Sequence, residues 1–337
     1  MKRNSWCHLA LLVVVAFVLS VPLLYAAEAQ AQKYDLKLGH VHPVDHPHQS
    51  VFTQFAERVA KETNGQVQIT VVAASGLGSL DEMAEQMMMG GLAMATYAPI
   101  NLSKADPRFM FDEMPYLWKD MDQFMNALQG DLGEIYKREA YKQKKLKILH
   151  FIPFGFRHMT NNLRPINKVE DLKGMKIRIA PSKLRLEAFQ MMGVNPTPMS
   201  FGELYTALQL KTVDGQENPA FTIYNSRFYE VQKYLSLTAH IMLLETFCFS
   251  GPVWEKLPRD IQEVIQKNAL IAEKDEFEIM KKNERQAVEL LKAKGMNVND
   301  VDLSSFKSAL RPLYVKYGPI FGPEIVNALK KYAGAEF

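Results

Sequence analysis

One arginine in the strand-like stretch DLKGMKIRIAPS (171–182) has a position suited to anion binding. Alternation along a strand puts Ile177 and Ile179 on one face and Arg178 on the other, so the guanidinium points away from the packed side, toward water, a partner or a cleft. Pro181 then opens a helix, whose N-terminus favours negative charge. A guanidinium at this place can hold a carboxylate through two parallel hydrogen bonds. An ion pair with Asp or Glu across a domain surface is the alternative.

The loop HVHPVDHPHQS (40–50) holds a second group of side chains that can bind ligands. Imidazoles at this density can bind zinc, and Asp45 would add an oxygen ligand. The residue types leave a metal site and direct contact with a solute both open. Four of the eight histidines lie in this loop, namely His40, His42, His46 and His48.

Strands and helices alternate along the chain, which predicts an α/β protein with a largely parallel sheet. A second α/β cycle starts near Arg157 and predicts two domains. Capping-box patterns at Ser79 and Ser200 mark two helix starts. We expect strands at 34–40, 66–74, 92–98, 146–151 and 176–180, and helices at 50–64, from 79 onward, at 182–192 and at 200–211.

A long segment without glycine or proline lies between Pro258 and Gly295. We predict a helix over about 259–294, which would be roughly 54 Å long at 1.5 Å per residue. A helix of that length is long enough to brace both domains. A break near Asp275 is the alternative.

Residues 1–31 have the pattern of a cleaved secretion signal. Two basic residues precede an apolar run from Leu9 to Val21, which is short for a membrane span. We place the cut after Ala31, with Ala29 as the alternative. Only Cys248 then remains, so no intrachain disulfide is expected. The formal net charge of the whole chain is +3, a balance that argues against nucleic-acid binding.

The motifs of common enzymes are missing from the sequence. GLGSLD (76–81) follows a strand and opens a helix, as a dinucleotide-binding loop does, but Asp81 stands where the third glycine should be. The chain has no G-x-S-x-G, H-E-x-x-H or G-x-x-x-x-G-K-[ST] motif. An enzyme is therefore the remote alternative.

Eight segments, in order over nearly the whole chain after residue 31, resemble the solute receptors of TRAP transporters. These are the tripartite ATP-independent periplasmic uptake systems, and the resemblance is to their dicarboxylate-receptor (DctP) type. The segments are YDLKLGH, VAKETNGQVQI, DLKGMKIR, PTPM followed by Phe201, ALQ, VDGQENP, FYEVQKYL and LPRDIQEVI. The resemblance implies a type II periplasmic-binding-protein fold, with two α/β lobes joined by crossing strands and by the long helix. Lobe I would comprise 32–154 and about 244–283, and lobe II 155–243 and about 284–337.

The resemblance also assigns roles to individual residues. Arg178 corresponds to the arginine that binds the ligand carboxylate, and Arg157 to a second arginine that lines the cleft. Asn218 corresponds to the asparagine that hydrogen-bonds the carboxylate or a neighbouring oxygen. Phe201 corresponds to an aromatic wall of the pocket.

The first loop would lie at the mouth of this cleft. There we expect His42 and Asp45 to contact the solute or to cap the next helix, and we expect no metal ion and no cofactor. Some relatives carry an acidic residue where this chain has Ala98, and Tyr97 would supply apolar wall instead.

The implied function is capture of a small organic acid in the periplasm and delivery to a TRAP membrane permease. Two arginines in one pocket make a C4-dicarboxylate the first expectation for the ligand. A uronate or another sugar acid is the second expectation. A receptor for an ABC importer or for a sensor kinase is the alternative function.

Overall fold

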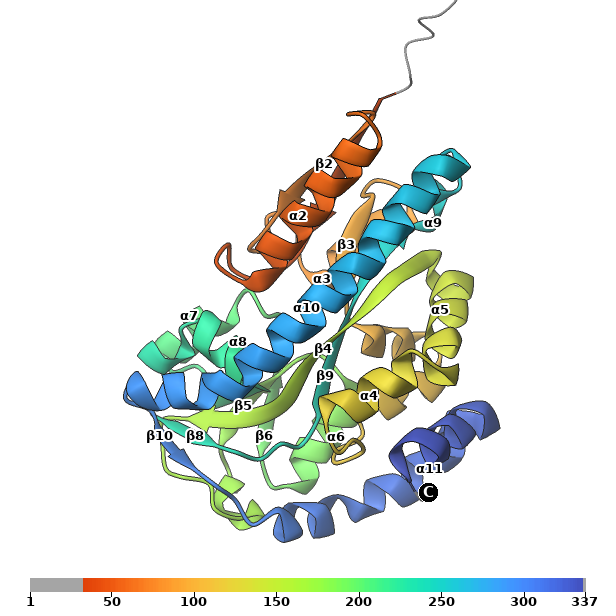
Figure 1. The fold of residues 1–337 in the computed structure, drawn as a ribbon. Helices are drawn as coiled ribbons and strands as arrows, with labels where there is room; N and C mark the ends of the chain where they lie inside the picture. The colour runs from red at the N-terminus through yellow and green to blue at the C-terminus, as the bar shows by residue number, and fades with distance from the viewer. Residues whose placement is uncertain (1–32, 336–337) are drawn as a thin grey trace, which may run out of the picture.

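The computed structural model describes residues 33–335, in which helices cover a mixed β-sheet (Figure 1). The predicted signal peptide, 1–31, lies outside these residues. The strands are β1 (Tyr34–Gly39), β2 (Val67–Val72), β3 (Met94–Tyr97), β4 (Leu146–Asn161), β5 (Lys176–Ile179), β6 (Asn195–Pro198), β7 (Gly215–Pro219), β8 (Tyr234–Ser236), β9 (Met242–Ser250) and β10 (Asn297–Asn299). Their order is β2-β1-β3-β9-β4-β7-β5-β6, with β8 paired to β4 and β10 to β8.

Two parallel parts of the sheet are joined by two long antiparallel strands. β1 pairs in parallel with β2 and β3, and β5 pairs in parallel with β6 and β7. Between them, β4 pairs antiparallel with β9 and then, from Arg157 to Asn161, with β7. The predicted parallel pairing is therefore confirmed in the outer parts of the sheet, and the centre of the sheet is antiparallel.

The central strand β4 is longer than the sequence pattern predicted. The alternation of apolar residues ends near Phe151, because Pro153 and Gly155 follow. In the structure the strand continues through an irregularity between these two residues, where Gly155 adopts a φ of 115°. Only glycine adopts such a backbone without strain, so this position lets one strand pass from one part of the sheet to the other.

The helices cover both faces of the sheet, and several begin where the sequence predicted. Ser79 and Glu82 form the expected reciprocal capping box of α3, and Ser182 caps α6. The helices are α2 (Pro47–Glu62), α3 (Leu80–Met88), α4 (Met121–Leu128), α5 (Asp131–Lys144), α6 (Lys183–Met191), α7 (Leu204–Gln209), α8 (Ala220–Asn225), α9 (Gly251–Trp254), α10 (Arg259–Ala293) and α11 (Leu303–Ala333). Short 3₁₀ helices are η1 (Pro99–Lys104), η2 (Pro107–Glu113), η3 (Val169–Leu172) and η4 (Phe228–Glu230).

The predicted long helix is confirmed as α10, one continuous helix of 35 residues without a break near Asp275. Its buried face repeats at helical spacing, with Ile261, Ile265, Ala272 and Met280 among its members. α10 contacts α2 beside the first part of the sheet and α8 and β10 beside the second (Figure 1). None of the helices described here is long and apolar enough to span a membrane.

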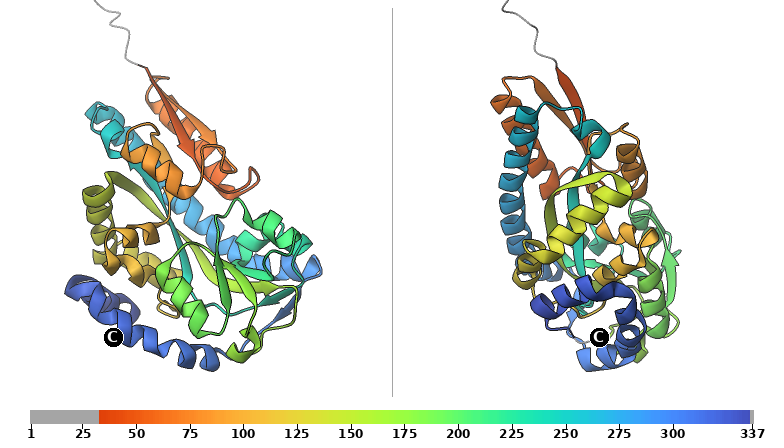
Figure 2. Two further views of the ribbon diagram at one scale, coloured as in Figure 1. Left: turned by 180° about the vertical axis from the view of Figure 1, so that it is seen from behind. Right: turned by 90° about the vertical axis from the view of Figure 1, so that its right-hand side faces the viewer.

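The C-terminal helix α11 also contacts elements of both parts. It bends at Gly322, whose φ is 75° and ψ 160°, and it packs against η2, α4 and α5 as well as against α6 and η3. Figure 2 shows α11 at the end of the molecule opposite α2. The predicted lobe boundaries, with about 284–337 in lobe II, stay a prediction, and α11 also contacts elements of predicted lobe I.

Candidate functional site

A cavity of about 420 Å³ lies between the two parts of the molecule. This volume lies in the range of small-molecule binding sites. Residues from β4, β5 and β7 line one side, and residues of the first loop, η1 and β9 line the other. Five of the seven predicted contact residues line it, namely Arg157, Arg178, Phe201, Asn218 and His42.

Arg178 is buried but pairs with no carboxylate among the described residues. Its Nε and Nη2 donate to the carbonyl oxygen of Met199 at 3.0 and 2.6 Å, and the side chain is 2% exposed. Its guanidinium carbon lies 6.0 Å from the centre of the Phe201 ring. Burial lowers the pKa of Arg178 to about 9, while the more distant charge of Glu217 opposes this shift and that of Arg157 adds to it. Arg178 therefore brings to the cavity a positive charge that is not neutralised by direct contact with any acid in the described part of the chain.

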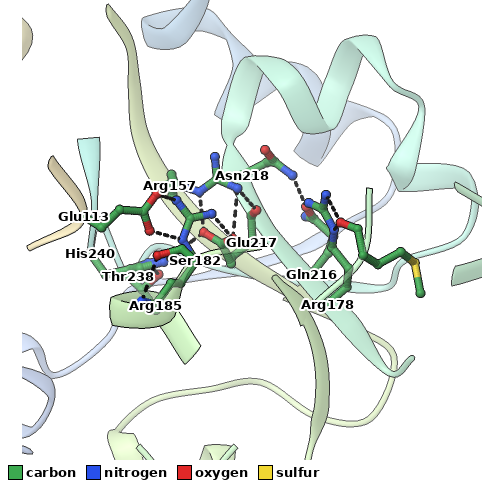
Figure 3. A network of polar contacts seen from close by, with 11 residues as sticks. Glu113, Arg157, Arg178, Ser182, Arg185, Gln216, Glu217, Asn218, Thr238 and His240 are labelled. Atoms are coloured by element: carbon green, nitrogen blue, oxygen red, sulfur yellow. Dashed lines mark hydrogen bonds and ion pairs between the residues drawn. The ribbon is translucent and has the colours of Figure 1, made fainter. Parts of the chain in front are cut away.

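Arg157 also lines the cavity, but its charge is already paired. Its Nε and Nη2 bind the carboxylate of Glu217, with Nη2 2.9 Å from Oε1. Arg185 donates to the same Oε1 at 3.0 Å and binds Glu113 with its other two nitrogens. Figure 3 shows these four side chains as one buried network. Two arginines and two carboxylates thus neutralise one another beside the cavity.

Glu217 is the centre of this network. It is fully buried, which would favour its neutral form, but Arg157 and Arg185 hold its pKa well below the usual range. Arg185 was not identified from the sequence. Its position could have indicated a buried ion pair, because Arg185 stands in the first turn of α6, where a basic side chain is unfavourable unless it is paired.

Asn218 lies beside Arg178 because of the strand register. Arg178 is aligned with Gln216 on the neighbouring strand β7, and Asn218 lies two residues further along the same face. The amide of Asn218 donates to Gln216 Oε1 at 2.6 Å (Figure 3). Among the described residues, this is the only hydrogen bond that the side-chain amide of Asn218 donates.

The first loop reaches the cavity through Val41 and His42, and Nε2 of His42 lies 3.0 Å from Glu245 Oε1. Asp45 does not line this cavity. It is exposed and borders a neighbouring hollow. Helix α2 is capped by Nδ1 of His46, which accepts from the backbone of His48.

Tyr97 is likewise absent from the cavity lining. Its side chain is buried, and its hydroxyl has no hydrogen-bond partner within residues 33–335. The next residue, Ala98, lines the cavity, and alternation along an extended chain turns Tyr97 to the opposite side. Contact of Tyr97 or Asp45 with a solute stays a prediction that this geometry does not support.

Asp112, a cavity residue that sequence reasoning missed, should make stability depend on pH. Burial raises its pKa to about 7, and the hydrogen bond from Tyr136 opposes this shift. Because the folded-state pKa lies above the unfolded value of about 3.9, stability falls as pH rises from 4 to 7.

In the variant Asp112→Asn the side chain at this position is uncharged at every pH. We expect it to stabilise the protein by about 2–4 kcal/mol at pH 8 and far less at pH 4, as measured by thermal denaturation. An equal effect at both pH values would contradict this assignment.

Comparison with known proteins identifies the family. The model of bacterial extracellular solute-binding protein family 7 matches residues 38–318, and the chain belongs to this family. The sialic acid-binding periplasmic protein SiaP of Vibrio cholerae is 32% identical over 312 residues, covering 92% of this chain and 97% of SiaP.

Solved TRAP periplasmic solute-binding proteins share the fold. A protein from Polaromonas sp. JS666, bound to D-erythronate, has a TM-score of 0.84 and 33% identity, over 90% of this chain and 100% of that chain. The sugar acid binding protein DctPAm from Advenella mimigardefordensis, in complex with galactonate, has a TM-score of 0.86 and 27% identity, over 90% and 99%. The expected TRAP receptor class and the two-lobed type II fold are confirmed, and this family binds solutes for transport.

Proposed function

We propose that this protein is the periplasmic receptor of a TRAP transporter for sugar acids that carry one carboxylate. It would be exported by the signal peptide cleaved near Ala31, bind its solute between the lobes, and deliver it to a membrane permease. The observation that carries the proposal is that the cavity contains one guanidinium, that of Arg178, without a carboxylate partner among the described residues.

The pairing of the second arginine favours a sugar acid over a C4-dicarboxylate. A dicarboxylate was the first expectation because two arginines were assumed to be available. Arg157 is bound to Glu217, so a second ligand carboxylate would have to compete with a buried ion pair. That exchange is costly, because Glu217 is buried and would lose one of the two arginines that compensate its charge.

The rest of the cavity suits a ligand with several hydroxyl groups. Carboxylates accept hydrogen bonds from hydroxyls, whereas they repel a second carboxylate. The named ligands of three relatives, sialic acid, D-erythronate and galactonate, are sugar acids of this kind and support the same proposal. The acidic residues of the lining include Asp81, Glu113, Glu203 and Glu245.

Binding would proceed through charge pairing followed by closure of the lobes. The ligand carboxylate would meet the remaining N–H groups of Arg178 and the amide of Asn218, with Phe201 against its carbon chain. Closure removes water from this pair and strengthens it. The ligand shifts the protein toward the closed form because it binds that form more tightly.

A thermal-shift panel tests the proposed ligand class. We expect galactonate, erythronate or glucuronate to raise the melting temperature of the mature protein, and succinate and neutral galactose to have no effect at equal concentration. A ligand at 100 times its dissociation constant adds about 2.7 kcal/mol of apparent stability. Stabilisation by succinate and by none of the sugar acids would overturn the choice of ligand, while stabilisation by galactose alone would overturn the carboxylate requirement itself.

A further inference from the structure

A buried cluster of ligating side chains lies at the edge of the cavity, where His42, His48 and Glu245 meet. One donor atom from each residue lies within 4.8 Å of the other two. The exposed fractions are 3%, 0% and 4%. The three residues come from the first loop, the first turn of α2 and β9, so the cluster joins segments that are far apart in the sequence.

Two atoms of this cluster face each other without forming a hydrogen bond. Nε2 of His48 and Oε2 of Glu245 are buried, have no hydrogen-bond partner in the described part of the chain, and are 3.7 Å apart. This separation is too long for a hydrogen bond. It is close to the spacing of ligand atoms around tetrahedral zinc, roughly 3.3 Å for bonds of about 2.0–2.1 Å. Nε2 of His42 lies 3.0 Å from the other oxygen of Glu245.

The second nitrogen of His48 has the partner that metal-binding histidines usually have. Nδ1 of His48 contacts the carboxylate of Glu276 on α10, and the other oxygen of that carboxylate lies 3.1 Å from Nε2 of His150. A carboxylate behind a histidine fixes the ring orientation and leaves the opposite nitrogen free to bind a metal. In this geometry Nε2 of His48 is directed at Glu245.

The neighbouring His46 does not belong to this ligand set. Its Nδ1 accepts a hydrogen bond from the backbone of His48. The proton of the neutral ring is therefore on Nε2, which cannot bind a metal while it carries that proton. The stacking of His46 on His42, with ring centres 4.3 Å apart, is a packing contact.

We propose that His42, His48 and Glu245 bind one first-row divalent metal ion, with zinc as the ion best suited to two imidazoles and one carboxylate. Such a ligand set leaves a coordination position open. Since His42 and Glu245 also line the cavity, that position faces the solute, and an oxygen of water or of a bound solute completes the coordination. The oxygen ligand is Glu245, from a distant strand, and not Asp45 of the same loop. This site does not depend on the proposed sugar-acid function.

Zinc binding by the full mature protein tests the proposal directly. After treatment with a chelator and its removal, the protein is titrated with zinc against a fluorescent zinc indicator. We expect one zinc ion per chain with a dissociation constant below about 1 μM. Cobalt, used as a spectroscopic probe, should give visible d–d bands without the sulfur charge-transfer band that binding at Cys248 would produce.

Three variants test whether zinc binds to these ligands and not to another histidine of the loop. His48→Gln and Glu245→Gln should each weaken zinc binding at least 100-fold while circular dichroism shows a folded protein. The matched control is His46→Asn, which keeps a good helix cap, removes a buried imidazole of the same loop and should bind zinc like the wild type. Failure to bind zinc at one per chain, or binding by either glutamine variant as in the wild type, would overturn the proposal. A loss of binding in His46→Asn equal to that in His48→Gln would overturn the ligand assignment.

Discussion

Arg178→Ala is expected to abolish sugar-acid binding while the protein stays folded. Truncating one partner of a buried, hydrogen-bonded charge pair costs about 2–5 kcal/mol, which corresponds to roughly 30-fold to several thousand-fold in the dissociation constant. The fold should survive, because within residues 33–335 Arg178 contacts no carboxylate and bonds only the carbonyl of Met199. Isothermal titration calorimetry measures the loss, and circular dichroism establishes the fold.

Arg178→Lys separates the geometry of the site from its charge. Lysine keeps the positive charge but has no planar fork, so it cannot form two parallel hydrogen bonds to a carboxylate. We expect the lysine variant to bind at least tenfold more weakly than the wild type. Binding of the lysine variant at wild-type strength would mean that the site needs only a positive charge near Phe201.

The largest expected effect on stability is that of Glu217→Gln. This change removes the negative charge that Arg157 and Arg185 share in the interior. Breaking a buried pair in this way costs about 3–5 kcal/mol, because uncompensated charge remains behind. Guanidinium chloride denaturation should show this decrease in the free energy of unfolding.

The matched control for Glu217→Gln is Glu324→Gln. Glu324 also binds an arginine through both oxygens, but that pair with Arg138 is about half exposed. Exposed pairs contribute roughly 0–1 kcal/mol. Equal effects of the two substitutions would contradict the view that the Glu217 network is a neutralised, buried part of the cavity wall.

Local patterns were sufficient to predict most of the elements. Capping at Ser79, the alternation in β1 and β2, and the uninterrupted segment of α10 all depend on residues that are near each other in the sequence. The continuation of β4 beyond Phe151 was missed because its second part is set by pairing with β7. Such pairing is a property of the folded sheet and leaves no local pattern.

The same distinction applies to the site. Arg178 could be singled out because an arginine among isoleucines is conspicuous in one strand. The pairing of Arg157 with Glu217 could not be predicted, since it depends on the register between β4 and β7. For the same reason the histidine loop suggested Asp45 as an oxygen ligand, whereas the folded chain brings Glu245 from β9 to His42 and His48.

The most direct test of the central claim is a crystal structure of the mature protein with the sugar acid that gives the largest thermal shift. We predict that the ligand carboxylate lies within hydrogen-bond distance of the Arg178 guanidinium, with the pair of Arg157 and Glu217 intact. A carboxylate bound elsewhere in the cavity, with Arg178 still bonded only to Met199, would contradict it.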